Sequence, residues 1–220
     1  MADRCLLYYI TDRSQLYGNE DDRRRALLDK IAEAAQAGID YIQLREKDLS
    51  SRELEGLALK AVAIIRGNSD STRLLINSRT DIALATGADG VHLRADDIAI
   101  REVRRGLGAV TPAARTLTTN HFLIGASCHS AAEVLHLESE GADFAVFAPV
   151  FGKSGGNGMQ AAGLDALREA CRAKLPVLAL GGVTIENGAS CLDAGAAGIA
   201  GIRLFQENKI EKVVQALRAI

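Results

Sequence analysis

Residues 86–93, Thr-Gly-Ala-Asp-Gly-Val-His-Leu, join the end of a stretch with helical period to a short apolar run. The same kind of junction recurs as Ala-Gly-Ile-Asp at 37–40, Glu-Gly-Ala-Asp at 140–143 and Asp-Ala-Gly-Ala-Ala-Gly at 193–198. The glycine in each junction can take the left-handed conformation that closes a helix. A chain that repeats this junction is predicted to consist of similar strand-and-helix units.

Short runs rich in Val, Ile, Leu and Tyr alternate with longer helix-period stretches along the whole chain, which is typical of parallel strands joined by crossover helices. The predicted strands are residues 5–11, 41–45, 73–77, 90–93, 123–128, 144–150, 176–181 and 198–204. The predicted helices are residues 21–37, 50–66, 81–85, 98–107, 130–140, 164–173, 184–194 and 208–220. This regularity favours an α/β fold, a closed (β/α)8 TIM barrel, over an open doubly wound sheet, whose pattern would break near a switch point. Residues 105–120 lack a clean period and are predicted to form an extended loop, with a weak helix as the alternative.

The composition predicts a single domain, residues 1–220, that acts on a small molecule. A chain of 220 residues with 48% hydrophobic types fits one compact core. The net charge of -2 and the lack of a polybasic segment argue against a nucleic-acid or membrane partner. The four cysteines are scattered, and the apolar run at 6–10 is too short for a signal peptide, so we expect a reduced, cytoplasmic protein. Assembly into a homo-oligomer is left open.

The second predicted strand ends in polar residues that suit a diphosphate. Because strand side chains alternate, Gln43, Arg45 and Lys47 are expected to point the same way, into the mouth formed by the carboxyl ends of the strands. Arginine supplies a planar fork and lysine a point charge, and both are common ligands of phosphate oxygens. The alternative interpretation is a solvated charge run at a strand end.

The third and fourth strands add an amide and carboxylates near the same mouth. Asn77 ends the third strand, where it is expected to contact substrate or to form only an Asn-Ser turn. Asp96 and Asp97 offer hard oxygen ligands for Mg²⁺ held chiefly by substrate phosphates and water. Capping of a helix that begins at Ile98 is the alternative role for Asp97. His92 is interpreted as a hydrogen-bonded core residue.

The fifth and sixth strand ends carry further candidates. Ser127 is interpreted as a hydrogen-bond donor to phosphate, and His129 as support for its loop or as a proton carrier. No acid is placed to complete a hydrolytic triad. Lys153 lies in a glycine-rich segment that is interpreted as a lid.

The seventh and eighth strand ends predict a second phosphate site. Gly181 and Gly182 offer bare backbone N–H groups beside a predicted helix start, which together form an anion cradle. Ile202 and Arg203 are placed near the end of the eighth strand. A phosphate site after strands seven and eight is a recurrent feature of this architecture.

In order and spacing these motifs resemble the thiamin phosphate synthase family over nearly the whole chain. The motifs are Gln-x-Arg-Glu-Lys at 43–47, Asn77, Gly-Val-His-Leu at 90–93, Ser-Cys-His at 127–129, Pro-Val-Phe at 149–151 and Gly-Gly-Val-Thr at 181–184. The resemblance implies a barrel enzyme, a transferase, that joins 4-amino-2-methyl-5-hydroxymethylpyrimidine diphosphate to thiazole phosphate and releases pyrophosphate with Mg²⁺.

The resemblance also implies roles for individual residues. The pyrimidine diphosphate would be held by Gln43, Arg45, Lys47, Asn77 and Ser127, the metal by Asp97, and the thiazole phosphate by Gly182, Ile202 and Arg203. The implied reaction is a dissociative substitution, in which pyrophosphate leaves, a pyrimidine methyl cation forms and the thiazole nitrogen attacks. Arg45, Lys47 and Ser127 would then assist by electrostatic stabilisation of the leaving group rather than by covalent catalysis.

The chain departs from the family pattern at three places. Ser78 stands where the family usually has an aspartate that is a second metal ligand, the lid is glycine-rich where the family has a Thr-x-Thr/Ser-Lys element, and Arg203 replaces a serine. The sister family of thiazole tautomerases is also similar, at Asn77, Arg79 and residues 81–84, which makes a tautomerase the first alternative. Pro149 argues against it, because tautomerases tend to have a catalytic histidine there. A non-catalytic phosphate-ligand-binding barrel is the second alternative.

Overall fold

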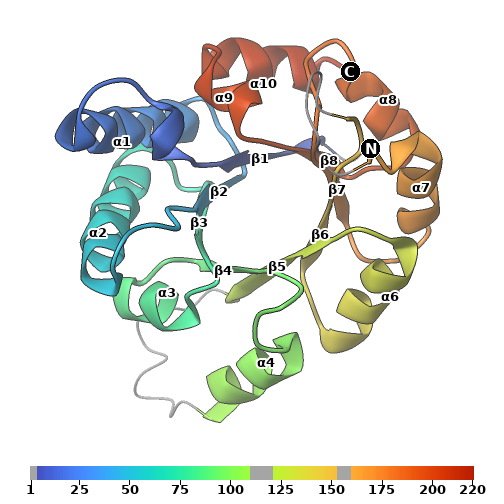
Figure 1. Ribbon diagram of the computed structural model, residues 1–220, viewed down its shortest axis with the longest axis horizontal. Coiled ribbons are helices and arrows are strands. Elements are labelled where there is room, and N and C mark those ends of the chain that lie inside the picture. The colour runs from blue at the N-terminus through green and yellow to red at the C-terminus, as the bar shows by residue number, and fades with distance from the viewer. Residues whose placement is uncertain (1–3, 110–120, 153–159) are drawn as a thin grey trace.

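The structure is a computed structural model that describes residues 4–109, 121–152 and 160–220. Within these ranges, eight parallel strands follow one another around a closed barrel, and the last strand pairs with the first. Helices ring the outside of the strands (Figure 1). The predicted (β/α)8 barrel is therefore confirmed.

The strands are β1 Leu6–Ile10, β2 Tyr41–Leu44, β3 Arg73–Asn77, β4 Gly90–Leu93, β5 Leu123–Cys128, β6 Phe144–Phe147, β7 Val177–Ala179 and β8 Gly198–Gly201. The helices are η1 Arg13–Gln15, α1 Glu20–Gln36, α2 Ser51–Asn68, α3 Thr80–Thr86, α4 Ile100–Ala109, α6 Ala131–Glu140, α7 Gly163–Ala170, α8 Gly188–Asp193, α9 Arg203–Gln206 and α10 Ile210–Arg218. No helix in the described ranges is both long and apolar enough to cross a membrane.

Several element boundaries differ from the sequence expectations. β8 ends at Gly201 instead of continuing to residue 204, and the apolar residues after it form α9. Leu204 and Phe205 look like strand residues in the sequence, but they are buried in the layer between barrel and helices. The helix expected from Thr184 begins at Gly188, and the helix expected from Ile98 begins at Ile100. The loop expected at 105–120 begins later than predicted, since α4 extends to residue 109, and its remainder lies outside the described residues.

The recurring glycine junction binds the strands together in pairs at their amino ends. Asp40, Asp89 and Asp143 each precede an even-numbered strand, and each accepts the backbone N–H of the odd-numbered strand before it. The donors are Leu7 N at 2.8 Å, Leu74 N at 2.8 Å and Ile124 N at 2.6 Å, respectively. In the fourth junction the corresponding residue is Ala197, whose own N–H donates to Val177 O at 2.8 Å. The motif seen in the sequence is therefore a tie between neighbouring strands.

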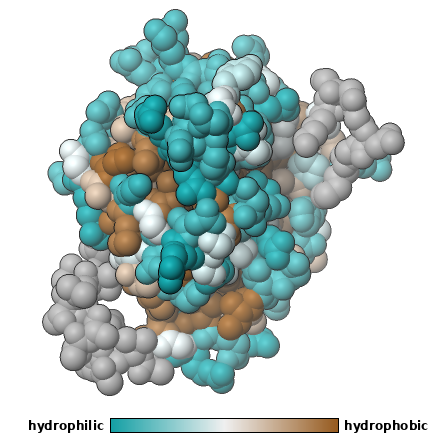
Figure 2. Space-filling model, turned by 60° about the vertical axis from the view of Figure 1, so that its left-hand side comes forward, coloured by the Kyte–Doolittle hydropathy of each residue, from teal (hydrophilic) through white to brown (hydrophobic). Residues whose placement is uncertain are grey.

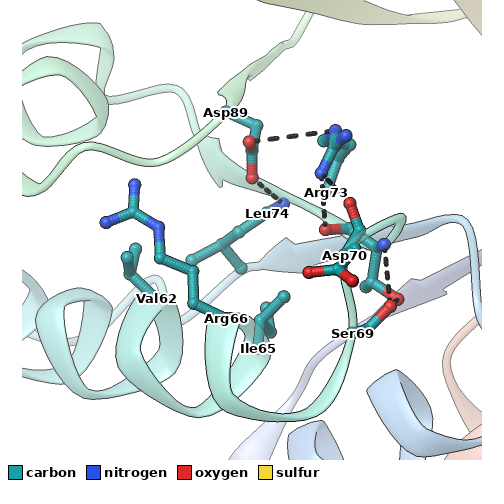
Figure 3. A pocket seen from close by; sticks show the side chains of 9 residues that line it. Val62, Ile65, Arg66, Ser69, Asp70, Arg73, Leu74 and Asp89 are labelled. Atoms are coloured by element: carbon teal, nitrogen blue, oxygen red, sulfur yellow. Dashed lines mark hydrogen bonds and ion pairs between the residues drawn. The ribbon is translucent and has the colours of Figure 1, made fainter. Parts of the chain in front are cut away.

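A cavity of about 210 Å³ opens at this same amino end, between α2 and the starts of β3 and β4. Figure 3 shows Asp89 above it, bonded to Leu74 N and lying 4.0 Å from the Arg73 guanidinium. In this architecture the amino end of the barrel carries stability, and the chemistry lies at the opposite end. We therefore assign this cavity to the framework.

Aromatic rings fill the inside of the barrel. Tyr41 and Phe144 stack with their ring centroids 5.0 Å apart, and Tyr8 meets both rings edge-on, at 5.9 and 5.4 Å. Gly125 makes room for this cluster, since a Cβ there would lie 2.4 Å from the Phe144 ring. The barrel is thus a packed core below its mouth, and ligands are confined to the carboxyl ends of the strands.

The outer surface is mostly hydrophilic on the side of α1 and α2. Figure 2 shows hydrophobic residues there in separate patches rather than in one continuous face. Single exposed apolar residues such as Leu59 and Leu84 are normal on a globular protein.

Candidate active site at the barrel mouth

Gln43 and Asn77 form the floor of the mouth. Gln43 is 2% exposed and donates from Nε2 to Asn77 Oδ1 at 3.0 Å. The two amides meet because β2 and β3 pair in parallel, with Gln43 beside Leu75. Asn77 Nδ2 donates in turn to Ser78 Oγ at 3.1 Å. The amides are therefore held in one orientation before any ligand arrives.

Positive charge gathers above this floor. Arg45 is half-buried directly after β2, and Lys47 is exposed two residues further on. The charge of Arg45, together with some burial and the charge of Arg94, lowers the pKa of Lys47. Three cations therefore share one region. Arg94 was not among the sequence candidates, although its position directly after β4 is a signal that could have identified it.

Glu46, between the two cations, turns away from the mouth and anchors their loop. It is 5% exposed, and its carboxylate accepts hydrogen bonds from Thr11 Oγ1 at 2.6 Å, Arg13 N at 3.1 Å and Arg13 Nη1 at 3.0 Å. Thr11 Oγ1 accepts the Arg45 N–H at 2.9 Å. Burial raises the pKa of Glu46, and the bonds from Thr11 and Arg13 oppose this shift. Through Thr11 and Arg13, which follow β1, Glu46 thus holds in place the backbone of Arg45.

Ser127 is linked to the inside of the barrel through His92. His92 is 2% exposed, with Nε2 2.9 Å from Ser127 Oγ and Nδ1 3.2 Å from the Tyr8 hydroxyl. Burial is the main cause that lowers the pKa of His92 to about 3, with Arg45 adding to the shift and Asp97 opposing it. The interpretation of His92 as a hydrogen-bonded core residue is confirmed.

Asp97 is tied to the loops around it. Its Oδ2 accepts hydrogen bonds from Ser78 Oγ at 2.6 Å and from Arg94 N at 2.7 Å, while its Oδ1 lies 3.4 Å from Arg94 Nη2. The alternative role as cap of a helix from Ile98 is wrong, because the carboxylate bonds a turn that precedes α4. Asp96 is exposed and lies 3.3 Å from the same Arg94 guanidinium.

The carboxylate of Asp97 fits Mg²⁺ through one oxygen. In the described ranges, no group of three or more His, Cys, Asp or Glu side chains could enclose a metal. Mg²⁺ does not need such a group when substrate phosphates and water complete its six ligands. Oδ2 already has two hydrogen-bond donors, so Oδ1 is the oxygen that suits the ion, provided that the half-exposed Arg94 guanidinium moves aside.

Gly181 and Gly182 form a tight backbone turn after β7. Both have positive φ, 97° and 66°, and a Cβ on either would lie within 2.8 Å of Pro149 or Phe151. In the described part of the chain the N–H groups of Gly182 and Val183 have no protein acceptor, which suits an anion. At the expected helix start, Thr184 and Asn187 cap each other: Thr184 N donates to Asn187 Oδ1 at 2.7 Å and Asn187 N donates to Thr184 Oγ1 at 3.3 Å. Regular helix follows from Gly188, whose N–H donates to Thr184 O at 3.0 Å.

The remaining candidates, after β5, β6 and β8, agree with their expected positions to different degrees. Ile202 precedes α9, and Arg203 is its exposed first residue, so the expectation that both lie on β8 is wrong. They still follow the strand beside β7, next to the glycine turn. His129 is exposed and its Nδ1 lies 2.6 Å from Ala148 O, which suits a supporting role for the loop. Lys153 lies outside the described residues.

The fold and the mouth define a class: a (β/α)8 barrel enzyme with side-chain amides on β2 and β3, cations after β2 and β4, and, among the described residues, backbone N–H groups without an acceptor after β7. A sequence profile of the thiamine monophosphate synthase family matches residues 7–205. The chain belongs to this family.

Individual relatives agree with this assignment. The chain is 38% identical over 216 residues to the thiamine-phosphate synthase of Methanoculleus marisnigri, with 96% of this chain and 93% of the relative covered. It is 35% identical over 207 residues to the thiamine-phosphate synthase of Caldanaerobacter subterraneus, with 93% and 88% covered. The solved thiamine phosphate pyrophosphorylase of Pyrococcus furiosus matches with a TM-score of 0.76 and 29% identity over 99% of this chain and 95% of that one.

Proposed function

We propose that this chain is a thiamin phosphate synthase, a transferase that couples the pyrimidine diphosphate to thiazole phosphate and releases pyrophosphate. The observation that carries the proposal is the placement of three cations at the carboxyl ends of two strands, Arg45 and Lys47 after β2 and Arg94 after β4, beside the Gln43–Asn77 amide pair. The amides suit the polar edge of the pyrimidine, and the cations suit the diphosphate attached to it.

The cations assist the reaction where negative charge grows. As the bond between the pyrimidine methylene carbon and the diphosphate breaks, the electron pair and its charge pass to the leaving pyrophosphate. The backbone N–H of Arg45 is held by the Glu46–Thr11 anchor, which keeps the base of this side chain in place during the reaction. Fixed charges of this kind stabilise a transition state more than mobile solvent does.

The second substrate is assigned to the glycine turn. The N–H groups of Gly182 and Val183, which have no acceptor among the described residues, lie beside the residues that follow β8, where Arg203 supplies a positive charge. A thiazole phosphate held there would approach the mouth from β7 and β8, while the pyrimidine diphosphate occupies β2 to β5. The two substrates would then meet over the centre of the barrel.

The proposal includes Mg²⁺, with Asp97 Oδ1 as its protein ligand. When bound there it would supply additional positive charge to the diphosphate oxygens. Ser78 and the backbone N–H of Arg94 orient the carboxylate, and the Arg94 guanidinium would turn from Asp97 toward the diphosphate. The cytoplasm is the proposed location, and the four free cysteines support a reducing compartment.

A substrate-omission experiment separates this proposal from its alternatives. With both substrates and Mg²⁺, a synthase yields thiamin phosphate and pyrophosphate. A tautomerase would act on the thiazole substrate alone and exchange one of its protons with solvent deuterium. A binding protein would raise its melting temperature with either ligand and release no product. Proton exchange without coupling, or binding without turnover, would overturn the proposal.

A further inference from the structure

Two neighbouring tyrosines on β1 point in opposite directions. Tyr8 and Tyr9 are both fully buried. Tyr8 projects into the barrel, where its hydroxyl lies 3.2 Å from His92 Nδ1, and Tyr9 projects outward, where its hydroxyl lies 3.3 Å from Gln206 Oε1. Through His92, the hydroxyl of Tyr8 is connected to the mouth, whereas that of Tyr9 serves the outer layer.

His92 joins Tyr8 to Ser127 and carries a single proton. Its Nε2 lies 2.9 Å from Ser127 Oγ. Burial makes the imidazole neutral at ordinary pH, because it lowers the pKa of His92 to about 3. In a neutral imidazole one nitrogen donates and the other accepts. The direction of both hydrogen bonds therefore depends on which nitrogen holds the proton.

The buried hydroxyl of Tyr8 decides between the two tautomers. In the described part of the chain, His92 Nδ1 is the one hydrogen-bond partner of this hydroxyl, and burial raises the pKa of Tyr8 well above its usual value, so the hydroxyl keeps its proton. A proton on Nδ1 would leave the fully buried Tyr8 O–H without an acceptor among the described residues. That loss disfavours the Nδ1–H tautomer about tenfold or more. Tyr8 therefore donates to Nδ1, and Nε2–H donates to Ser127 Oγ.

We infer that Tyr8 is a positioning residue that fixes the His92 tautomer and so leaves the Ser127 hydroxyl proton free to donate to substrate. Ser127 then selects an acceptor, such as a phosphate oxygen or an unprotonated ring nitrogen, and disfavours an N–H group at the same place. The inference rests on the proposed function only for the identity of that substrate, the pyrimidine diphosphate. The tautomer itself is a property of the free protein.

The direct test is nitrogen NMR of the free, unmodified protein. The chain has four histidines, and the His92 signals are those that disappear in His92→Gln. We expect two-bond proton-nitrogen correlations at neutral pH to show a protonated Nε2 and an unprotonated Nδ1. An Nδ1–H tautomer or a doubly protonated ring would overturn the inference, whether or not the protein makes thiamin phosphate.

A pair of matched variants tests the effect on substrate. Tyr8→Phe removes the hydroxyl that fixes the tautomer, and Tyr9→Phe removes an equally buried hydroxyl on the same strand. We expect Tyr8→Phe to give a mixture of tautomers and to raise KM for the pyrimidine diphosphate about tenfold, with a smaller effect on kcat. Tyr9→Phe should leave the tautomer and KM unchanged. Equal kinetic effects of the two variants, or a Tyr8→Phe protein with altered stability and normal KM, would contradict the positioning role.

Discussion

Ser78, which directly follows the mouth amide Asn77, donates a hydrogen bond from its Oγ to Asp97 Oδ2 at 2.6 Å. Ser78 has a φ of 59°, a left-handed conformation that aspartate and asparagine tolerate well. Ser78→Asp should therefore fit the backbone and place a second carboxylate beside Asp97. We expect the apoprotein to lose stability through charge repulsion, and Mg²⁺ to restore it.

Ser78→Asn is the matched control, since it has the same shape without the charge. Melting temperatures with and without Mg²⁺ should separate the two variants, with a larger Mg²⁺-dependent rise in Ser78→Asp. An equal response of both variants would mean that no cation binds at Asp97.

Arg94 is expected to compete with a metal for Asp97 Oδ1, which it faces at 3.4 Å. Arg94→Gln should therefore bind Mn²⁺, used as a paramagnetic substitute for Mg²⁺, more tightly, as measured by electron paramagnetic resonance of the free ion. Arg79→Gln is the control, because Arg79 pairs with Asp81 instead. Tighter Mn²⁺ binding in both variants would mean that the loss of any nearby positive charge is sufficient, without competition for Asp97. Weaker Mn²⁺ binding in Arg94→Gln would contradict the competition.

Lys47 should contribute through its charge on the diphosphate. Lys47→Ala and Arg45→Ala are each expected to lower kcat/KM about 10- to 100-fold, the usual effect of losing a hydrogen bond to a charged group. Lys60→Ala, an exposed lysine on the outer helix α2, should have no effect. Steady-state kinetics with the pyrimidine diphosphate as the varied substrate measure the difference. Full activity of both mouth variants would show that the diphosphate does not bind at this site.

Glu46 should matter more for stability than its neighbour Asp48, although both pair with Arg13. The Glu46 side chain is 1% exposed and that of Asp48 is 72% exposed. Glu46→Gln breaks a buried pair and should cost about 3 kcal/mol of unfolding free energy. Asp48→Asn breaks a pair whose carboxylate is exposed to solvent, so it should cost less than Glu46→Gln, even though both Asp48 oxygens bond the buried Arg13 guanidinium. Urea unfolding measures both, and equal losses would mean that the buried anchor has no special role.

The stability of the fold should depend on His92 in acid. Because the folded pKa of about 3 lies below the ordinary value of 6.5, the unfolded chain binds the proton first as pH falls. The stabilising contribution of neutral His92 is complete above pH 6.5 and is lost as pH falls toward 3, by at most about 1.4 kcal/mol per pH unit. Urea unfolding at a series of pH values gives the unfolding free energy as a function of pH. His92→Gln should flatten this curve between pH 6.5 and 3, whereas substitution of the exposed His136 by Gln should not. Identical profiles for wild type and His92→Gln would contradict the assignment.

The barrel could be predicted from the sequence because its signals are local. The junctions at residues 37–40, 86–90 and 140–143 announce each helix end and the strand that follows, and the structure places them there. Leu204 and Phe205 misled the prediction, since a short apolar run suits a strand or a buried turn of helix equally well.

The mouth was predicted only in part, because its geometry depends on distant residues. Strand alternation for Gln43 and the position of Asn77 at a strand end were enough to propose both for the same mouth, and the two amides do meet. The inward turn of Glu46 depends on Arg13 and Thr11, more than thirty positions earlier, and no local pattern reveals that partnership. After Gly182, Thr184 and Asn187 cap each other across a turn, and regular helix begins only at Gly188, four residues later than expected.

The most direct test of the proposed function is the product balance of the wild-type protein. Purified enzyme is incubated with the pyrimidine diphosphate, thiazole phosphate and Mg²⁺, and thiamin phosphate and pyrophosphate are quantified together. We expect both products to form in equal amounts, and neither to form when thiazole phosphate is omitted. Absence of thiamin phosphate at high enzyme concentration would contradict the assignment of the barrel mouth as a thiamin phosphate synthase site.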